Sequence, residues 1–363
     1  MTARFYSTAA LHRFTRDVFM RAGVPAEDAD WTAQALVQAD LQGLSSHGVS
    51  RLAAYVNGIV RGKVKPVPAI RVTESGPAIA MVDGDDGLGP VVAKVAMEAA
   101  MDRAERIGVG VVTVRNGNHI GSLSIYTEMA MARHLIGVAL CNGQSAIPPW
   151  GGRRPYFGTN PIALAAPHGD GEPVSIDMAT SVVARGKIIL AAKRGEPIPE
   201  GWALDEHGRP TTDPVSALRG AVLPMAGAKG YGLALAVEVL SGVLSGAQFG
   251  DRVGSVYDDS PGMPGTGMFF MALNPAFFIG QRVFADRMEA LVRDIRAIPP
   301  ADGFDRVYLP GERRRHTRRM REAEGIPVPP ETMREFEQLS QQYNVPLPPA
   351  MERNREQCVR AHL

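Results

Sequence analysis

The sequence predicts an α/β fold, because strand-like and helix-like segments alternate through its middle part. Short apolar runs typical of strands lie at residues 70–73, 78–82, 109–114, 136–141, 162–166 and 174–177. Segments with helical periodicity lie at residues 91–107, 124–134, 181–193 and 231–244. Helices that follow strands in this way are typical of a sheet covered by helices.

The composition limits the class of protein. The 363 residues suffice for two or three domains with cores of their own. A net charge of +1 gives no overall field that favours nucleic acid or an acidic membrane. Cys141 and Cys358 lie far apart, which favours a reducing compartment over a disulfide framework. The longest apolar stretch, residues 231–247, contains Glu238 and therefore indicates a buried helix. We expect a cytoplasmic protein that does not enter a membrane.

Three helices are expected near the N-terminus, at residues 11–20, at residues 26–41 and after Ser46. Ser46 is suited to cap the third helix, because its hydroxyl accepts from a free backbone N–H of the first turn. His47 and Arg51 are four residues apart, so this helix would present both on one face. A helix start that carries His and Arg is suited to a carboxylate. For the pair alone, a solvated polar face is the simpler interpretation.

A second histidine stands where α/β proteins bind ligands. The strand at residues 109–114 leads into a glycine-rich loop that contains His119. An imidazole titrates near neutral pH, so His119 is suited to exchange a proton with a substrate oxygen or nitrogen. Taken alone, a loop histidine is more often structural.

Glycine- and proline-rich segments favour a flat, phosphate-bearing ligand. Residues 149–152 and 157–161 allow a close approach of the backbone. Asp177 ends a strand and is suited either to a ribose hydroxyl or to a turn. Lys229 opens a helix within a glycine-rich stretch, residues 227–232, which is typical of a phosphate site.

Several familiar motifs are missing from the sequence. It contains neither a Walker A loop nor a clean G-x-G-x-x-G, which disfavours a conventional Rossmann phosphate loop. HExxH and paired CxxC motifs are absent too, so we expect no metal site. The arginine-rich helix expected at residues 312–322 is short, interleaved with acids and without aromatic partners. We therefore expect no nucleic-acid partner.

A set of short motifs, in this order, resembles the malate/L-lactate dehydrogenase family of type 2 over nearly the whole chain. Each motif is weak alone, but the ordered combination is specific. The motifs are Ser46-His47-Gly48-Val49-Ser50-Arg51-Leu52, Asn118-His119-Ile120-Gly121, Gly158-Thr159-Asn160-Pro161, Asp177-Met178-Ala179-Thr180-Ser181, Gly186-Lys187, Thr211-Thr212-Asp213-Pro214, Lys229-Gly230-Tyr231-Gly232-Leu233 and Pro310-Gly311-Glu312.

The resemblance implies a fold distinct from the Rossmann fold. A cofactor-binding α/β domain with a mixed sheet would span residues 71–267. A helical domain would be formed from both chain ends, residues 1–70 and 268–345, followed by a C-terminal tail at 346–363. The resemblance also implies a homodimer and NAD or NADP as cofactor.

The resemblance assigns roles to particular residues. His119 would be the general acid/base. The substrate-binding residues would be His47, Arg51, Ser46 and Thr159. The cofactor-binding residues would be Asn118, Asp177, Met178, Ala179, Lys229, Gly230, Gly311 and Glu312. The stretch Ser122-Leu123-Ser124 departs from the family pattern, so the substrate is not carried over, and Arg185 leaves the choice of cofactor open.

These expectations lead to one main hypothesis and two alternatives. The main one is an oxidoreductase that transfers hydride between NAD(P) and a small 2-hydroxy or 2-keto acid, the carboxylate substrate. A close alternative is a reductase of cyclic imino acids, acting on a C=N bond. A different class is a dinucleotide-binding regulator without turnover.

Overall fold

The computed structural model describes residues 4–351 except residues 170, 172 and 258–261. The chain divides into two compact units, residues 1–57 with 313–363, and residues 58–312. We call them the terminal unit and the sheet unit. Cys358 and the end of the predicted tail lie outside the described residues.

The terminal unit is mainly helical and combines both chain ends, as predicted. Its elements are β1 (Arg4–Tyr6), α1 (Thr8–Arg21), α2 (Ala26–Leu41), the start of α3 (Leu52–Val60), nearly all of α10 (Glu312–Glu324), β12 (Ile326–Val328) and α11 (Pro330–Tyr343). β1 pairs with β12 in antiparallel fashion. Phe14 of α1 packs on Phe336 of α11 with ring centroids 4.8 Å apart. The two ends of the chain therefore share one core.

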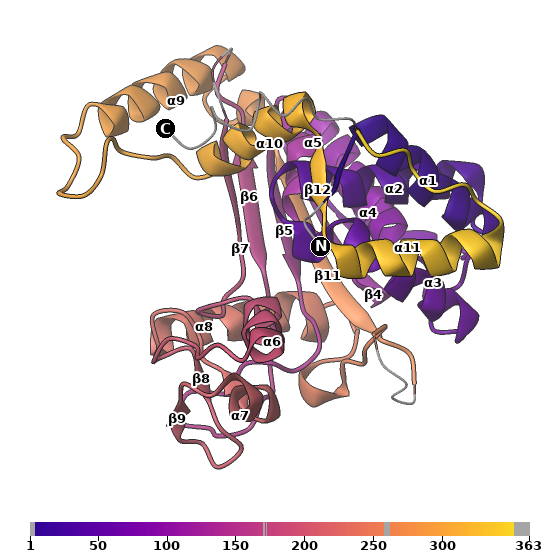
Figure 1. The fold of residues 1–363 in the computed structure, drawn as a ribbon. Helices are drawn as coiled ribbons and strands as arrows, with labels where there is room; N and C mark the ends of the chain where they lie inside the picture. The colour runs from indigo at the N-terminus through magenta and orange to yellow at the C-terminus, as the bar shows by residue number, and fades with distance from the viewer. Residues whose placement is uncertain (1–3, 170, 172, 258–261, 352–363) are drawn as a thin grey trace. The chain divides into compact units, whose positions relative to one another are not determined.

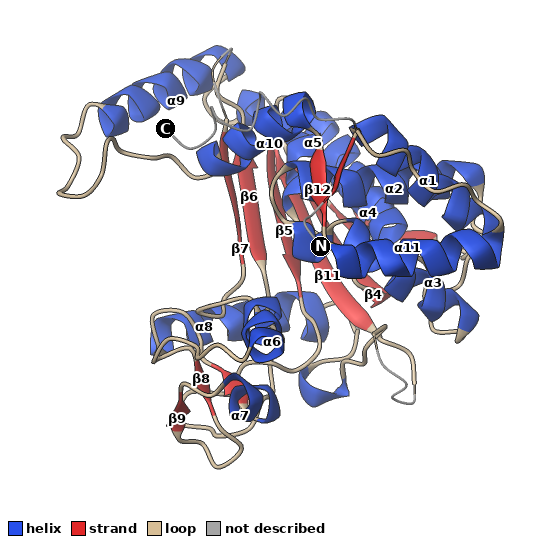
Figure 2. Ribbon diagram, in the orientation of Figure 1, coloured by secondary structure: helices blue, strands red, loops and turns tan. Residues whose placement is uncertain are grey.

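The sheet unit is built on a seven-stranded mixed sheet in the order β2-β3-β4-β11-β5-β6-β7. Figure 2 shows five of these strands, β4, β11, β5, β6 and β7, next to one another. The strands are β2 (Arg71–Gly76), β3 (Ile79–Asp83), β4 (Val109–Gly117), β5 (Ile136–Cys141), β6 (Ile162–Ala166), β7 (Val174–Met178) and β11 (Thr266–Leu273). β3 and β4 are parallel, and the other neighbouring pairs are antiparallel. The predicted mixed, non-Rossmann sheet is confirmed.

Helices cover both faces of this sheet. α4 (Gly89–Ile107) and α5 (Ser124–Ala132) pack on one face, while α8 (Ala228–Glu238) and the π-helical turn Val239–Val243 pack on the other. Neighbouring residues of β11 point to opposite faces, as the pleat of a strand requires. Phe270 meets Tyr126 of α5 edge-on, and Phe269 packs with Val237 of α8.

A small lobe lies between β7 and α8 in the chain (Figure 1). It consists of α6 (Arg185–Arg194), β8 (Ala203–Leu204), β9 (Pro210–Thr211), α7 (Pro214–Arg219) and β10 (Ala221–Val222). Its own core is formed by Val183, Ile188, Ile198, Ala203, Ala217 and Val222.

The boundary predicted between residues 267 and 268 needs correction. β11 is a central strand of the sheet, paired with β4 on one side and β5 on the other. The following helix, α9 (Gln281–Arg296), belongs to the sheet unit as well. Residues 58–70 and 268–312 therefore leave the predicted helical domain. The predicted boundary is wrong because β11 pairs with strands that are distant in sequence, and no local sequence pattern indicates such a pairing.

Among the described residues, no helix combines the length and apolar character that a membrane crossing needs.

Candidate active site

Strand directions bring several loops of the sheet unit to one edge. β4, β5 and β7 run in one sense, and β6 and β11 run in the other, as their antiparallel pairings require. The loops that follow the first three strands and precede the other two therefore share an edge. These loops carry His119 and Thr159, and Asp177 lies near the end of β7 at the same edge, which we call the site edge.

His119 is held tightly at the site edge, just beyond β4. The flanking residues Asn118 and Ile120 are buried, and the histidine itself is half-buried. The imidazole meets the ring of Tyr257 edge-on, with centroids 5.5 Å apart. A Cβ on Gly89, the first residue of α4, would lie 2.1 Å from the carbonyl oxygen of His119. The backbone of His119 thus lies directly against the start of α4.

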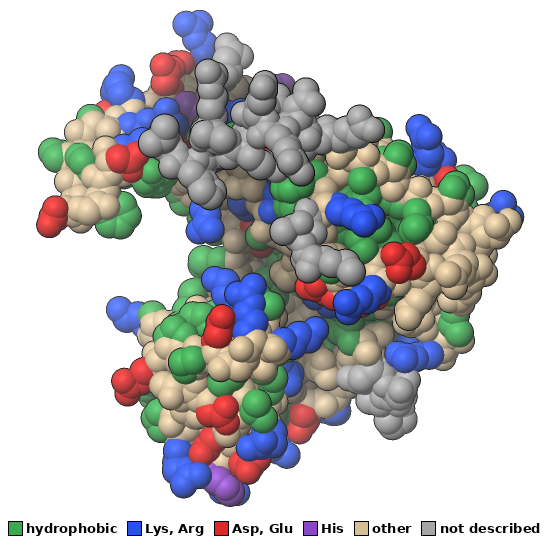
Figure 3. Space-filling model, viewed as in Figure 1, with side chains coloured by type: hydrophobic (Ala, Val, Ile, Leu, Met, Phe, Trp, Pro, Cys, Tyr) green, Lys and Arg blue, Asp and Glu red, His purple; other side chains and the backbone are tan. Residues whose placement is uncertain are grey.

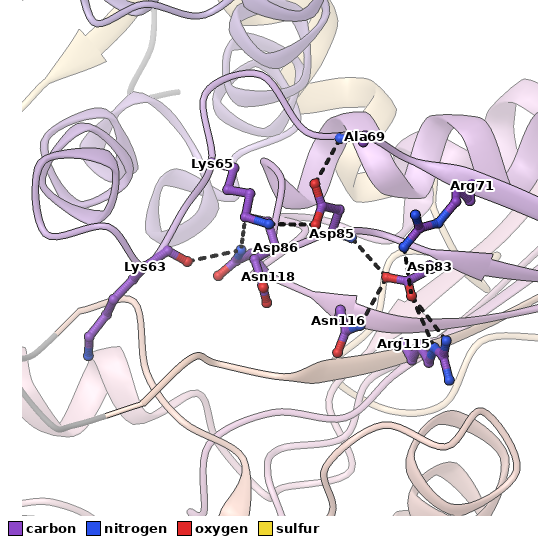
Figure 4. A network of polar contacts seen from close by, with 10 residues as sticks. All are labelled: Lys63, Lys65, Ala69, Arg71, Asp83, Asp85, Asp86, Arg115, Asn116 and Asn118. Atoms are coloured by element: carbon purple, nitrogen blue, oxygen red, sulfur yellow. Dashed lines mark hydrogen bonds and ion pairs between the residues drawn. The ribbon is translucent and has the colours of Figure 1, made fainter.

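Asn118 fastens this loop to a neighbouring one (Figure 4). Its Nδ2 donates to the carbonyl oxygens of Asp86 at 3.0 Å and Gly87 at 2.9 Å. Oδ1 of Asn118 is buried and has no hydrogen-bond partner within the described part of the chain. The side chain predicted to contact a cofactor therefore positions His119, and its contact with a cofactor stays a prediction.

A network of charges supports the same loops (Figure 4). The carboxylate of Asp83 accepts from Asn116 Nδ2 at 2.9 Å and from Arg115 Nη2 at 3.1 Å. Asp85 pairs with Lys65 at 2.5 Å. Burial raises the pKa of Asp83, but the hydrogen bonds from Asn116 and its other donors outweigh burial and lower that pKa below its usual value. These carboxylates therefore remain ionised at neutral pH and act as anchors.

Asp177 ties the His119 loop to β7. Its Oδ2 accepts from the Ser122 hydroxyl at 2.8 Å and from the Ser124 N–H at 2.9 Å. Ser124 is the first residue of α5, so Asp177 satisfies a backbone donor that the helix leaves open. The serines that depart from the family pattern are thus the partners of Asp177. A ribose contact of Asp177 stays a prediction.

Thr159 is brought next to the segment that follows β7. Its carbonyl oxygen accepts from both the N–H and the hydroxyl of Thr180, each at 2.9 Å. The next residue, Asn160, has a φ of +34°, a conformation that costs energy for a residue other than glycine. Its amide nitrogen is held by Glu238 at 2.6 Å and by the Ala234 carbonyl at 2.9 Å.

Glu238 is an organising residue whose role the sequence analysis missed. It is 3% exposed, and its Oε1 accepts from Asn142 Nδ2 at 3.2 Å and from the Gly250 N–H at 2.8 Å. Asn142 in turn accepts from the Gly267 N–H at 2.8 Å. One buried carboxylate therefore joins both ends of the loop between β5 and β6 to the loop before β11. A single acid within an apolar helix is the signal that could have found it.

The predicted cofactor residues on α8 lie at the start of that helix, as expected. Lys229 is exposed in the first turn, and Gly227 precedes the helix with a φ of +63°. A Cβ on Gly230 would lie 2.0 Å from the Met225 carbonyl oxygen, so only glycine fits there. The first turn therefore presents backbone N–H groups beside a lysine.

Three further predicted cofactor residues lie on or beside β7. Met178, followed by Ala179, ends this strand and is 42% exposed. The Ser175 N–H, near the start of β7, donates to the Pro310 carbonyl at 3.2 Å, which places Gly311 beside that end of the strand.

Glu312 is already engaged in ion pairs. Its carboxylate pairs with Arg296 at 2.8 Å and with Arg306 at 3.4 Å, and the side chain is 5% exposed. A ligand would have to compete with both arginines for this carboxylate.

The His47 segment, in the terminal unit, differs from the predicted helix start. Two short 3-10 turns, Ser45–His47 and Val49–Arg51, precede α3, which begins only at Leu52. Extended backbone at Gly48, with φ −91° and ψ −153°, separates the two turns. Ser46 therefore does not cap α3.

Ser46 instead links the two predicted substrate-binding side chains. Its hydroxyl lies 2.9 Å from His47 Nδ1, and its carbonyl accepts from Arg51 Nε at 2.5 Å. The structure thus links His47 and Arg51 through Ser46, and not through a shared face of one helix.

A basic cavity of about 480 Å³ opens in the sheet unit. Its arginines come from several segments and are Arg154, Arg185, Arg219 and Arg252. Two of its walls, residues 144–146 and 251–255, belong to loops of the site edge. Figure 3 shows Lys and Arg side chains gathered over and beside α6, which begins with Arg185.

Within the described residues, ion pairs engage two of these four arginines. Arg154 pairs with Asp251 at 3.4 Å, and Arg219 pairs with Glu206 at 2.8 Å. Such a cavity is suited to phosphate or carboxylate groups. Within the described residues, no cluster of three or more His, Cys, Asp or Glu side chains is placed to hold a metal ion.

Residues 6–337 match the family model described as malate/L-lactate dehydrogenase, and the chain belongs to that family. Its named relatives include dehydrogenases of hydroxy acids, so the protein is an oxidoreductase that acts on CH–OH groups. The L-sulfolactate dehydrogenase of Methanocaldococcus jannaschii is 43% identical over 86% of this chain and 89% of its own length. A solved structure of sulfolactate dehydrogenase from the same organism, 39% identical, superimposes with a TM-score of 0.89 over 94% of this chain and 98% of that one.

Two further relatives show the range of the family. The ureidoglycolate dehydrogenase (NAD(+)) of Escherichia coli O157:H7 is 39% identical over 89% of this chain and 92% of its own length. A structure of delta1-piperideine-2-carboxylate reductase from Pseudomonas syringae has a TM-score of 0.84 and 32% identity, covering 92% of this chain and 99% of that one.

We predict that Asn118→Ala impairs His119 while the protein stays folded. The substitution removes the Asn118 donor from the Gly87 carbonyl and one of two donors from the Asp86 carbonyl, which also accepts from the Lys65 N–H. This loss costs about 1–3 kcal/mol of unfolding free energy. A displaced His119 lowers kcat by about tenfold to a hundredfold. Urea denaturation and steady-state kinetics measure the two effects. Asn274→Ala, in the turn after β11, is the matched control. An unchanged kcat in Asn118→Ala would show that Asn118 does not position the histidine.

Proposed function

We propose that the protein transfers hydride between NAD or NADP and a small 2-hydroxy or 2-keto acid. The observation that carries this proposal is the rigid placement of His119 at a sheet edge whose loops also line a basic cavity. The imidazole supplies an acid/base group, and the cavity supplies positive charge for anionic groups. The family's named dehydrogenases support the same reaction class.

The residues of the sheet unit fit a nicotinamide dinucleotide. Lys229 and the first turn of α8 offer donors to a phosphate, and the arginine-lined cavity offers more. Met178 and Ala179 lie at one end of β7, and Gly311 lies beside the other end. Together they would contact an extended ligand along the strand. The orphaned Oδ1 of Asn118 is an acceptor next to His119. The bound nicotinamide supplies or takes up the hydride at the substrate carbon.

The chain's own residues bind the acid and move the proton. Arg51 would bind the substrate carboxylate with its planar guanidinium, assisted by His47 and Ser46. In the reducing direction His119 donates a proton to the C2 oxygen, and in the oxidising direction it accepts that proton. Thr159, at the same edge as His119, would contact the substrate.

The experiment that tests the proposal compares both cofactors over one substrate panel. Oxidation of NADH and of NADPH is followed in parallel with 2-keto acids and with cyclic ketimines. The proposal expects turnover with at least one 2-keto acid. Binding of a dinucleotide without turnover on any acid would contradict it and favour a regulator.

Cyclic imino acids remain the second candidate, because the piperideine-carboxylate reductase shares this fold. The same groups would act on a C=N bond, with His119 as proton donor to nitrogen. Turnover restricted to ketimines would select this candidate. Arg185 lines the basic cavity, so a substitution of this residue would test whether the protein prefers NADP.

We predict that His119→Ala lowers kcat by about a hundredfold or more, because the general acid/base is lost. Steady-state kinetics at saturating substrate measure the change. His207→Ala, which removes an exposed histidine of the same unit, is the control and keeps wild-type kcat. Unchanged turnover in His119→Ala would remove this residue from the mechanism.

We predict that Arg51→Lys raises the KM for the acid by about tenfold or more, because lysine lacks the planar fork. The KM for the cofactor should stay close to wild type. Initial-rate kinetics with each substrate varied in turn measure both constants. The control is Arg21→Lys, on the exposed end of α1. A wild-type KM for the acid would contradict the assignment of Arg51.

We further infer that two copies of the chain pair through the outer face of α8 and of the π-helical turn Val239–Val243 that follows it. The inner face of this helix packs on the sheet through Val237. Leu235, Val239 and Val243, spaced four residues apart, are 40%, 47% and 55% exposed on another face. A contiguous exposed apolar stripe of this kind marks a protein interface. The resemblance implies a homodimer, so the partner that we propose for this stripe is a second copy of the chain.

We predict that Val239→Asp converts a dimer into a monomer, because a buried charge without a partner is unfavourable at an interface. Light scattering after size-exclusion chromatography measures the mass. Val215→Asp, at an exposed position on α7, should leave the dimer intact. A monomeric wild-type protein at micromolar concentration would contradict the pairing.

A further inference from the structure

The buried carboxylate of Asp40 contacts the segment that carries His47 and Arg51. Asp40 is in the last turn of α2 and is 3% exposed. Its Oδ2 accepts from the Val49 N–H at 2.7 Å. Ser45 donates its side-chain hydroxyl to the same carboxylate. Asp40 therefore contacts both 3-10 turns that flank Gly48, through Ser45 in the first turn and Val49 in the second.

Gly48 has no room for a side chain because of this carboxylate. A Cβ at this position would lie 2.2 Å from both Cγ and Oδ2 of Asp40. The φ of Gly48 is −91°, so any residue could adopt this φ. Close approach to Asp40, rather than backbone strain, is what requires glycine here. The contact also explains why the predicted helix does not begin at Ser46.

The C-terminal part of the terminal unit contacts the same point. Arg321 of α10 donates through Nη1 to the Asp40 carbonyl oxygen, and the same nitrogen lies 3.4 Å from the Ser45 hydroxyl. Asp40 is thus joined to the residues after it and to a helix from the other chain end.

Burial of Asp40 is costly unless the carboxylate has partners. Burial raises its pKa to about 6, while the hydrogen bonds from Val49 and Ser45 and the charge of Arg321 oppose that rise. Asp40 is therefore ionised at pH 7 and above. A buried ionised group retained at this place, with its donors drawn from one functional segment, indicates a positioning role.

We propose that Asp40 is the positioning residue of the substrate-binding segment. Its carboxylate holds the Val49 N–H next to Gly48 and so fixes the backbone on both sides of this glycine. The position of Ser46, which contacts His47 and Arg51, is fixed in turn, and with it the orientation of both side chains towards an acid. The proposal rests on the proposed function in assigning His47 and Arg51 to the substrate. It adds that the affinity for the acid depends on a residue that does not touch the acid.

The test compares three variants of the full-length protein. Asp40→Ala removes the acceptor and leaves the Val49 N–H buried and unpaired. Gly48→Ala pushes a methyl group into the carboxylate. Asp40→Asn keeps an acceptor oxygen of the same shape and should rescue the segment. The initial rates of each are measured with the acid varied and with the cofactor varied.

We expect Asp40→Ala and Gly48→Ala to raise the KM for the acid by about tenfold to a hundredfold, the effect of one orphaned buried donor. The KM for the cofactor and kcat at saturation should change by less than about threefold, because their residues lie in the sheet unit. Asp40→Asn should stay within about fivefold of the wild-type KM for the acid.

Phe336→Leu is the matched control, because it weakens the core of the terminal unit away from this segment. Circular dichroism confirms that each variant is folded and gives its melting temperature. The control should lower the melting temperature without raising the KM for the acid.

Three results would overturn the proposal. One is an unchanged KM for the acid in folded Asp40→Ala, or in Gly48→Ala if Asp40→Ala does not fold. The others are equal increases in both KM values and a similar increase in Phe336→Leu. Failure of the proposed function looks different, because the wild type would turn over no acid. Calorimetric titration of the acid would then still compare Asp40→Ala with the wild type.

Discussion

The architecture of the sheet unit depends on the insertion of β11 between β4 and β5. Without this strand the sheet would separate into two parts, because β4 and β5 do not pair with each other. β11 reaches this place from about 150 residues further along the chain than β4. Its alternating side chains fill both faces, with Phe270 towards α5 and Phe269 towards α8. Once β11 is in place, the strand directions determine which loops share the site edge.

Polar anchors then turn that edge into a defined site. Asn142 couples the end of β5 to the start of β11 through the Gly267 N–H, and Glu238 couples Asn142 to Asn160. Asp177 and Asn118 hold the two sides of the His119 loop. Each of these side chains is buried or half-buried and is held mainly by hydrogen bonds to backbone or amide groups. This is the arrangement that fixes a catalytic side chain before a substrate arrives.

Much of the fold could be predicted from the sequence, where local signals suffice. The strands at 136–141 and 162–166 were predicted with the bounds of β5 and β6, because short apolar runs ended at polar or proline-containing turns. β11 escaped prediction, since it follows a glycine-rich stretch and its partners are distant. Ser46 was misassigned as a cap for a related reason. The capping pattern was present, but contact between Gly48 and Asp40 overrides it.

The sequence predicts which residues belong to the candidate site better than it predicts the contacts that hold them in place. Residue chemistry singled out His119, the pair His47 and Arg51, and also Asp177 and Lys229. The remaining residues came from the ordered motifs through a resemblance. Neither source indicated that Asn118 and Asp177 are bound to loop and helix backbone, or that Glu238 organises the edge. Those roles arise from burial and from partners distant in sequence, which a single sequence does not display.

The central claim is that hydride passes between the cofactor and C2 of a carboxylic acid. The most direct measurement uses a reduced cofactor deuterated at the transferred position of the nicotinamide, with a 2-keto acid that the enzyme reduces. Mass spectrometry and NMR of the product locate the label. The account predicts one deuterium at C2 of the 2-hydroxy acid. A product without deuterium at C2, or no oxidation of either cofactor with any acid, would contradict it.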